Sequence, residues 1–200
     1  MDGVLSLDDV RLNGKHILFR VDVNSPLHPE TRAFLDDGRL RAITETLRAL
    51  ADSKVVLIGH QSRPGRNDFT DLSGHADRLA RILGRPVGFV PDVCGDAAIE
   101  AIREMKDGDI LCLDNVRMHP EEIALKRAPI EELRVSNIVT TLAPEFDAYV
   151  TDAFAASHRN SPSLTGFSEE LPCIAGRLME KEINALQTAV NNPPRPYVAI

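Results

Sequence analysis

The sequence predicts an α/β fold: an open parallel sheet with helices on both faces. Three observations support this prediction. Strand-like and helix-like segments alternate along the chain, the strand-like segments are nearly unbroken apolar runs, and 43% of the 200 residues are hydrophobic against 26% charged. Alternating strands and helices indicate right-handed βαβ crossovers, and continuous apolar strands are typical of a parallel sheet covered on both faces.

Five short apolar segments are expected to form the strands of this sheet. The two clearest are His16–Val21 and Lys54–Gly59, which carry almost uninterrupted hydrophobic side chains. The other expected strands are Pro86–Val90, Asp109–Leu113 and Asp147–Thr151.

Amphipathic helices are expected between these strands. Leu40, Ile43, Leu47 and Leu50 recur at three- and four-residue spacing and form one apolar face. Asp36-Asp37 precedes this segment and can cap its first turn. Similar apolar stripes predict helices within residues 72–83, 97–105 and 130–142.

The last thirty residues have a different character. We expect residues 1–172 to form one α/β lobe and residues 173–200 to form a linker helix, over Leu178–Val190, followed by the first strand of a second lobe. Pro193 and Pro194 stop the helix, because proline cannot continue one. A charged terminal carboxylate directly after the expected apolar strand 195–200 is unusual, so we expect the natural protein to continue beyond Ile200.

Composition and charge exclude several classes of function. A net charge of −7 leaves no overall basic surface for nucleic acid, and no apolar run approaches the roughly 20 residues needed to span a membrane. Acidic residues near the N-terminus, where a secretory signal has Lys or Arg, indicate a cytoplasmic protein. Cys94, Cys112 and Cys173 are odd in number and far apart, so we expect reduced thiols.

The candidate functional residues follow the strands, because ligands of open parallel sheets bind at the carboxyl ends of the strands. Guanidinium groups gathered there would bind phosphate or carboxylate through charge-assisted hydrogen bonds. The residues in these positions are Asp22 and Asn24, His60 and Arg63, Asp114, Arg117 and His119, and Asp152, His158 and Arg159.

Taken singly, these residues leave alternatives open. Asp22 could be a turn former or the nucleophile or ligand of a metal-assisted phosphatase, although no second acidic cluster accompanies it. No His has the partners of a zinc site, and no metal is expected in this chain. The chain also contains no phosphate-binding loop or Gly-x-Gly-x-x-Gly motif, so no nucleotide cofactor is expected in it.

The ordered set of motifs resembles the phosphoglycerate kinase family over essentially all 200 residues. The wording His60-Gln61-Ser62-Arg63-Pro64 resembles the archaeal branch, whereas other members more often have His-Leu-Gly-Arg-Pro. The other matching segments are Arg20–Leu27, Asp37–Ala42, Asp114–Arg117, Asp152–Arg159 and Gly176–Glu182.

This resemblance implies a two-lobed enzyme that transfers a phosphoryl group reversibly between 1,3-bisphosphoglycerate and ADP. The present chain would be the Rossmann-like lobe that binds 3-phosphoglycerate, while magnesium and ATP or ADP would bind the other lobe. The resemblance implies three groups of site residues: Asp22 and Asn24 at the hydroxyl and carboxylate end, His60, Arg63, Arg117 and Arg159 around the 3-phosphate, and Arg39 at the transferring phosphoryl group.

Two departures from the family pattern accompany these expectations. Arg177 stands where the family usually has Phe, beside the linker helix, and Gln61-Ser62 replaces Leu-Gly.

The chain alone is expected to be inactive, and the whole protein is expected to be a monomer. The exposed apolar side of the linker helix could drive self-association of the fragment. The alternative function is a stand-alone anion-binding α/β module without catalysis.

Overall fold

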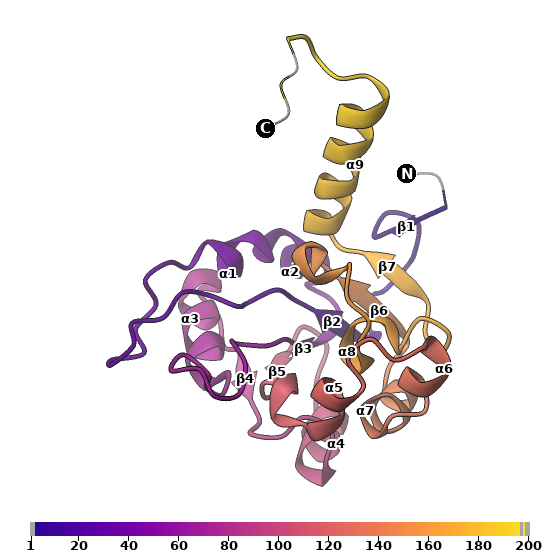
Figure 1. Ribbon diagram of the computed structural model, residues 1–200. Helices are drawn as coiled ribbons and strands as arrows, with labels where there is room; N and C mark the ends of the chain where they lie inside the picture. The colour runs from indigo at the N-terminus through magenta and orange to yellow at the C-terminus, as the bar shows by residue number, and fades with distance from the viewer. Residues whose placement is uncertain (1–2, 197, 199–200) are drawn as a thin grey trace.

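The computed structural model describes residues 3–196 and 198 (Figure 1). Within these residues, seven parallel strands form one sheet in the order β1-β7-β6-β2-β3-β5-β4. The strands are β1 Leu5–Ser6, β2 His16–Arg20, β3 Lys54–Ile58, β4 Gly88–Phe89, β5 Ile110–Cys112, β6 Ala148–Thr151 and β7 Cys173–Ala175. This sheet confirms the predicted fold class.

The helices lie on both faces of the sheet (Figure 1). Buried side chains of α1, α2 and α3 pack on one face, and those of α4 and α7 pack on the other. The α-helices are α1 Gly38–Ala42, α2 Thr44–Ala49, α3 Ser73–Leu83, α4 Asp96–Arg103, α5 Pro120–Ala124, α6 Ile130–Leu133, α7 Asn137–Leu142, α8 Pro162–Thr165 and α9 Arg177–Asn191. Short 3-10 turns span Val116–Met118, Ala143–Glu145 and Phe154–Ala156.

The central strand β2 explains why the expected strands are apolar along their whole length. Ile17 and Phe19 point into the core beneath α1–α3, and Leu18 points into the core on the opposite face. All three side chains are fully buried. Because helices cover both faces of this parallel sheet, a central strand needs apolar side chains at every position, as the sequence indicated.

Two of the expected helices are interrupted. The single helix expected over 130–142 is wrong: α6 and α7 are separate, because Ser136 has an extended backbone conformation and its hydroxyl donates to the Leu133 carbonyl at 2.7 Å. Residues 40–50 likewise form α1 and α2, separated at Ile43. Of the two aspartates expected to cap this segment, Asp36 accepts a hydrogen bond from the Gly38 amide at 2.8 Å, whereas the Asp37 side chain binds Arg41 and Arg78.

Strands β1 and β7, which lie next to each other at one edge of the sheet, were not expected from the sequence. Strand β7 pairs with both β6 and β1, so the sheet of the lobe extends three residues beyond the boundary expected at 172/173. The strand expected over 195–200 lies partly outside the described residues, and Arg195, Pro196 and Val198 are not in a strand.

Helix α9 projects away from the rest of the fold (Figure 1). Its base is held by Asp152, which accepts a hydrogen bond from the Met179 amide at 3.0 Å, and by an ion pair from Arg177 to Asp8. Arg177 also pairs with Glu180 within the helix. Met179 is the buried residue of this helix, while Leu186 and Val190 are exposed. No helix within the described residues is long and apolar enough to cross a membrane.

Candidate functional site

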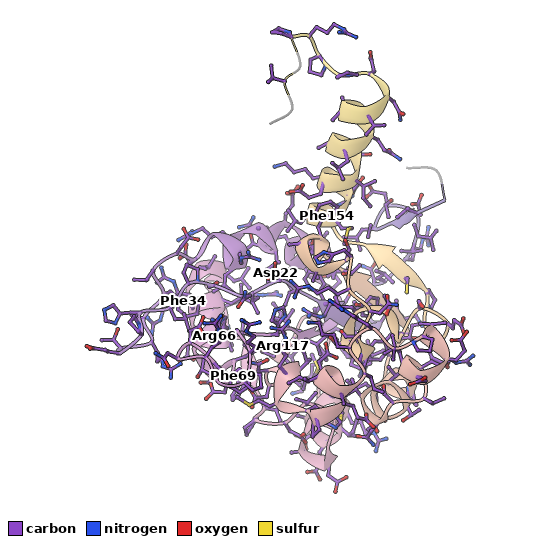
Figure 2. All side chains as sticks on the ribbon, viewed as in Figure 1. Asp22, Phe34, Arg66, Phe69, Arg117 and Phe154 are labelled. Atoms are coloured by element: carbon purple, nitrogen blue, oxygen red, sulfur yellow. The ribbon has the colours of Figure 1, made fainter. Side chains whose placement is uncertain are left out.

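A cavity of about 1170 Å³ opens at the carboxyl ends of β2, β3, β5 and β6. The structure brings all seven site residues named from the sequence into its lining. These residues are Asp22, Asn24, Arg39, His60, Arg63, Arg117 and Arg159. Asp114 and His119, which also follow a strand, do not line the cavity. Figure 2 shows the labelled Asp22, Arg66 and Arg117 in this region, with Arg66 and Arg117 below α1 and α2 in that view.

The cavity carries a large excess of positive charge. Seven arginines and one lysine line it, against three carboxylates. Among the described residues, Arg39 is the one cavity cation with a carboxylate within 4 Å. The cations without such a partner are Arg20, Arg63, Arg66, Arg117, Lys126, Arg127 and Arg159. Cations without protein counter-ions are suited to bind an anion by charge-assisted hydrogen bonds.

Arg20 and His60 form the buried floor of the cavity. The Arg20 side chain, at the end of β2, donates from Nε to Ser163 Oγ at 3.2 Å and contacts His60 Nδ1 through Nη2 at 3.2 Å. Because a guanidinium has no acceptor, His60 Nδ1 must accept, which places the imidazole proton on Nε2. Burial first, and then the positive charges of Arg20 and Arg117, lower the pKa of His60 to about 2. His60 is therefore a neutral hydrogen-bond donor at neutral pH.

Glu122 anchors the segment that carries Arg159. This buried carboxylate accepts hydrogen bonds from the Ser161 hydroxyl at 2.7 Å, the Ser163 hydroxyl at 2.7 Å and the Ser163 amide at 2.9 Å. The Ser163 hydroxyl also accepts a hydrogen bond from Arg20, so it links the Glu122 carboxylate to the floor of the cavity. A buried carboxylate with this many donors is well satisfied.

Asp22, Asn24 and Arg39 lie close together in the cavity. Asp22 forms an ion pair with Arg39 and accepts a hydrogen bond from the Asn24 amide at 3.2 Å. The Asn24 side-chain oxygen in turn accepts from the Ser62 amide at 2.8 Å. The Arg39 side chain is 44% exposed, whereas the side chain of Asp22 is 12% exposed. The exposed guanidinium of Arg39 is therefore the member of this pair that an incoming anion can reach from solvent.

Arg117 is fixed by its neighbours before any ligand is present. Its backbone amide donates to the Asn115 side chain at 3.1 Å, and its guanidinium donates to the Ser62 carbonyl. Burial, together with the charges of Arg159 and Arg20, lowers the pKa of Arg117. A bound anion would offset the part of this lowering that comes from the neighbouring arginine charges.

Several lining residues were missed by reasoning from the sequence. Arg20 had a usable signal, because an arginine inside an apolar strand must find partners when it is buried. Glu122 is the second of two adjacent glutamates, a pattern that does not indicate a buried carboxylate. Arg66, Lys126 and Arg127 had no signal in the sequence. They reach the cavity only through the path of their loops.

No group of three or more His, Cys, Asp or Glu side chains in the described part of the chain is arranged to hold a metal ion. The carboxylate of Asp22, which a metal-assisted phosphatase would use as nucleophile or ligand, is instead paired with Arg39.

The fold and this cavity together define an α/β lobe with a strongly cationic cavity at the carboxyl ends of its strands. The sequence model of the phosphoglycerate kinase family matches residues 7–200, and the chain belongs to this family. The resemblance stated from the motifs is thereby confirmed.

Individual relatives agree with this assignment. The chain is 48% identical over 197 residues to phosphoglycerate kinase of Methanothermobacter thermautotrophicus and 47% identical to that of Methanobacterium bryantii. These alignments cover 98% of this chain but 47% and 48% of the relatives, so the chain spans about half the length of the curated relatives it matches.

Solved structures show the same fold. The crystal structure of phosphoglycerate kinase from Pyrococcus horikoshii OT3 superposes with a TM-score of 0.91 at 38% identity, covering 96% of this chain and 47% of that one. The structure of phosphoglycerate kinase from Coxiella burnetii gives a TM-score of 0.76 at 25% identity, covering 96% and 46%.

Proposed function

We propose that this chain is the N-terminal, 3-phosphoglycerate-binding half of a phosphoglycerate kinase. The whole protein would transfer a phosphoryl group reversibly between 1,3-bisphosphoglycerate and ADP in glycolysis and gluconeogenesis. The observation that carries the proposal is the cavity in which seven cations lack a carboxylate partner, in a chain of this family. A ligand with a phosphate at one end and a carboxylate at the other matches this charge.

At the phosphate end, the residues would act by positioning and charge. Arg63, Arg117 and Arg159 would donate to the phosphate oxygens, and guanidinium groups suit this because they can donate two parallel hydrogen bonds. His60 would add its Nε2 proton without adding a charge, since its pKa of about 2 keeps it neutral. Arg20 holds this imidazole in place from below.

At the other end, the pair Asp22–Arg39 would separate as the substrate enters. Asp22 and Asn24 would bind the hydroxyl and carboxylate of the glycerate, and Arg39 would turn toward the transferring phosphoryl group. Phosphoryl transfer depends mainly on positioning and on neutralising charge, which one arginine can supply. The acceptor oxygen is already ionised, so no general base is required of this chain.

Magnesium and ATP or ADP would be held by the second lobe of the whole protein and would supply or accept the phosphoryl group. We therefore expect the chain alone to bind substrate but not to turn it over. Residues 173–200 would connect the lobes, and exposed Leu186 and Val190 on α9 suit a surface that packs against the second lobe. The whole protein is expected to be a cytoplasmic monomer.

Calorimetric titration of the chain with 3-phosphoglycerate tests the proposal. We expect binding that weakens as salt is added, and at least a tenfold loss of affinity in Arg63→Ala and in Arg159→Ala. Arg103→Ala is the matched control, because Arg103 pairs with Glu145 and does not line the cavity. Its affinity should stay within twofold of the wild type.

Other outcomes would favour the other functions. Equal affinity for sulfate and 3-phosphoglycerate would favour a general anion-binding module without catalysis. Phosphatase activity that is abolished by Asp22→Asn and by EDTA would favour the metal-assisted phosphatase.

A further inference from the structure

The buried side chain of Gln61 joins two of the loops that form the cavity. Gln61 is 0% exposed and follows His60 directly after β3. Its amide oxygen accepts from the Ser25 amide at 3.0 Å, and its amide nitrogen donates to the Ser25 carbonyl at 3.0 Å. This double hydrogen bond links the loop after β3 to the loop after β2.

The contacts to Ser25 also determine the state of a neighbouring histidine. A backbone N–H only donates and a carbonyl only accepts, so the orientation of the Gln61 amide is fixed. His75 Nε2 lies 3.1 Å from the Gln61 amide oxygen and must therefore donate to it. Burial lowers the pKa of His75 to about 4, which keeps the imidazole neutral in this arrangement. His75, on helix α3, thus donates a further hydrogen bond to the side-chain amide of Gln61.

The backbone around Gln61 extends the link to a third loop. The Gln61 carbonyl accepts from the Asn115 side chain at 2.8 Å, in the loop after β5. The next residue, Ser62, donates its amide to Asn24 and accepts from the Arg117 guanidinium. The side chains at both ends of the cavity are therefore connected through residues 61 and 62.

We propose that Gln61 is a positioning residue that sets the separation between the Asn24 end and the Arg63–Arg117 end of the cavity. This inference rests on the proposed function, because it concerns how a ligand with two charged ends is recognised. Such a ligand is sensitive to the distance between its two binding groups. A small symmetrical anion, which is bound by the guanidinium groups alone, is not.

The test compares the affinities of the full chain for 3-phosphoglycerate and for inorganic sulfate, both measured by calorimetry. Gln61→Leu keeps the approximate volume of the side chain and removes both hydrogen bonds to Ser25. We expect affinity for 3-phosphoglycerate to fall at least tenfold and affinity for sulfate to change less than twofold. The ratio of the two affinities is the informative quantity, because a general loss of structure would lower both together.

A matched control separates positioning from stability. Ile102→Ala removes a fully buried side chain of α4 on the opposite face of the sheet, and it should leave both affinities within twofold of the wild type. If Gln61→Leu does not fold, Gln61→Asn serves in its place. Its shorter side chain keeps the amide but cannot reach both groups of Ser25, so we expect a three- to tenfold loss for 3-phosphoglycerate alone.

Two results would overturn the positioning role. One is wild-type affinity for 3-phosphoglycerate in the folded variant at position 61, and the other is an equal loss for sulfate and 3-phosphoglycerate. Failure of the wild-type chain itself to bind 3-phosphoglycerate would overturn the proposed function as well, and is thereby distinguishable.

Discussion

Acidification is expected to destabilise the folded chain through two buried histidines. The pKa of His60 is about 2 and that of His75 is about 4, and burial is the main cause of both shifts. In the unfolded chain, the pKa of a histidine is about 6.5. Between these values the unfolded chain binds a proton that the folded chain does not bind. Lowering the pH through this range therefore favours the unfolded state.

The size of the effect follows from the distance between the pH and the unfolded pKa. At pH 5 the unfolded imidazole lies about 1.5 units below its pKa, and one unit corresponds to about 1.36 kcal/mol. Each histidine thus lowers the free energy of unfolding by about 2 kcal/mol between pH 7.5 and pH 5. The two together lower it by about 4 kcal/mol, which is large beside the roughly 5–15 kcal/mol that stabilises a typical domain.

Urea unfolding at pH 7.5 and pH 5 measures this difference. On acidification from pH 7.5 to pH 5, we expect the free energy of unfolding of His75→Gln to fall by about 2 kcal/mol less than that of the wild type, because one of the two imidazoles is gone. Comparing the two proteins cancels the contributions of carboxyl groups such as Asp114, whose pKa is raised by burial. His158→Gln is the control, since this imidazole is exposed to water in the folded chain. An acid loss in His75→Gln that equals the wild-type loss would refute the reasoning.

Two further substitutions test the buried carboxylates. Glu122→Gln replaces one of the two carboxylate oxygens by an NH2 group, which then faces either the Ser163 N–H or the hydroxyls of Ser161 and Ser163. We expect the free energy of unfolding, measured in urea, to fall by about 2–4 kcal/mol. The exposed Glu131→Gln should cost less than about 0.5 kcal/mol, and similar losses in both variants would contradict the role of the carboxylate. Asp152→Ala removes the acceptor for the Thr46 hydroxyl and the Met179 amide. We expect a loss of about 1–3 kcal/mol and faster amide hydrogen exchange in the first turn of α9, and unchanged exchange would show that Asp152 does not hold this helix.

The fold could be predicted where burial leaves a regular pattern. Strands β2 and β3 are covered on both faces, so their apolar runs identify them. The strands β1 and β7 have two and three residues, which is too short for a pattern to stand out. The break at Ser136 was missed because Leu133 and Ile138 are both buried and continue one apparent apolar stripe across two helices.

The site could be predicted where polar or charged residues come directly after a strand. Asp22, His60 and Arg117 lie at one edge of the sheet because parallel strands bring their carboxyl ends together. Glu122 could not be found in this way, since its partners Ser161 and Ser163 come from a distant segment. Nor could Gln61, because an amide in a loop is normally expected to face water.

The sequence by itself determined the parallel α/β fold, the edge of the sheet at which the charged side chains gather, and the family to which the chain belongs. Only the tertiary structure decided which cations lack a carboxylate partner, which nitrogen of His60 carries the proton, and how Gln61 joins the loops. The reason is that these properties depend on distances between groups far apart in the chain. The hydrogen bond from Arg20 to Ser163, for example, joins residues 143 positions apart.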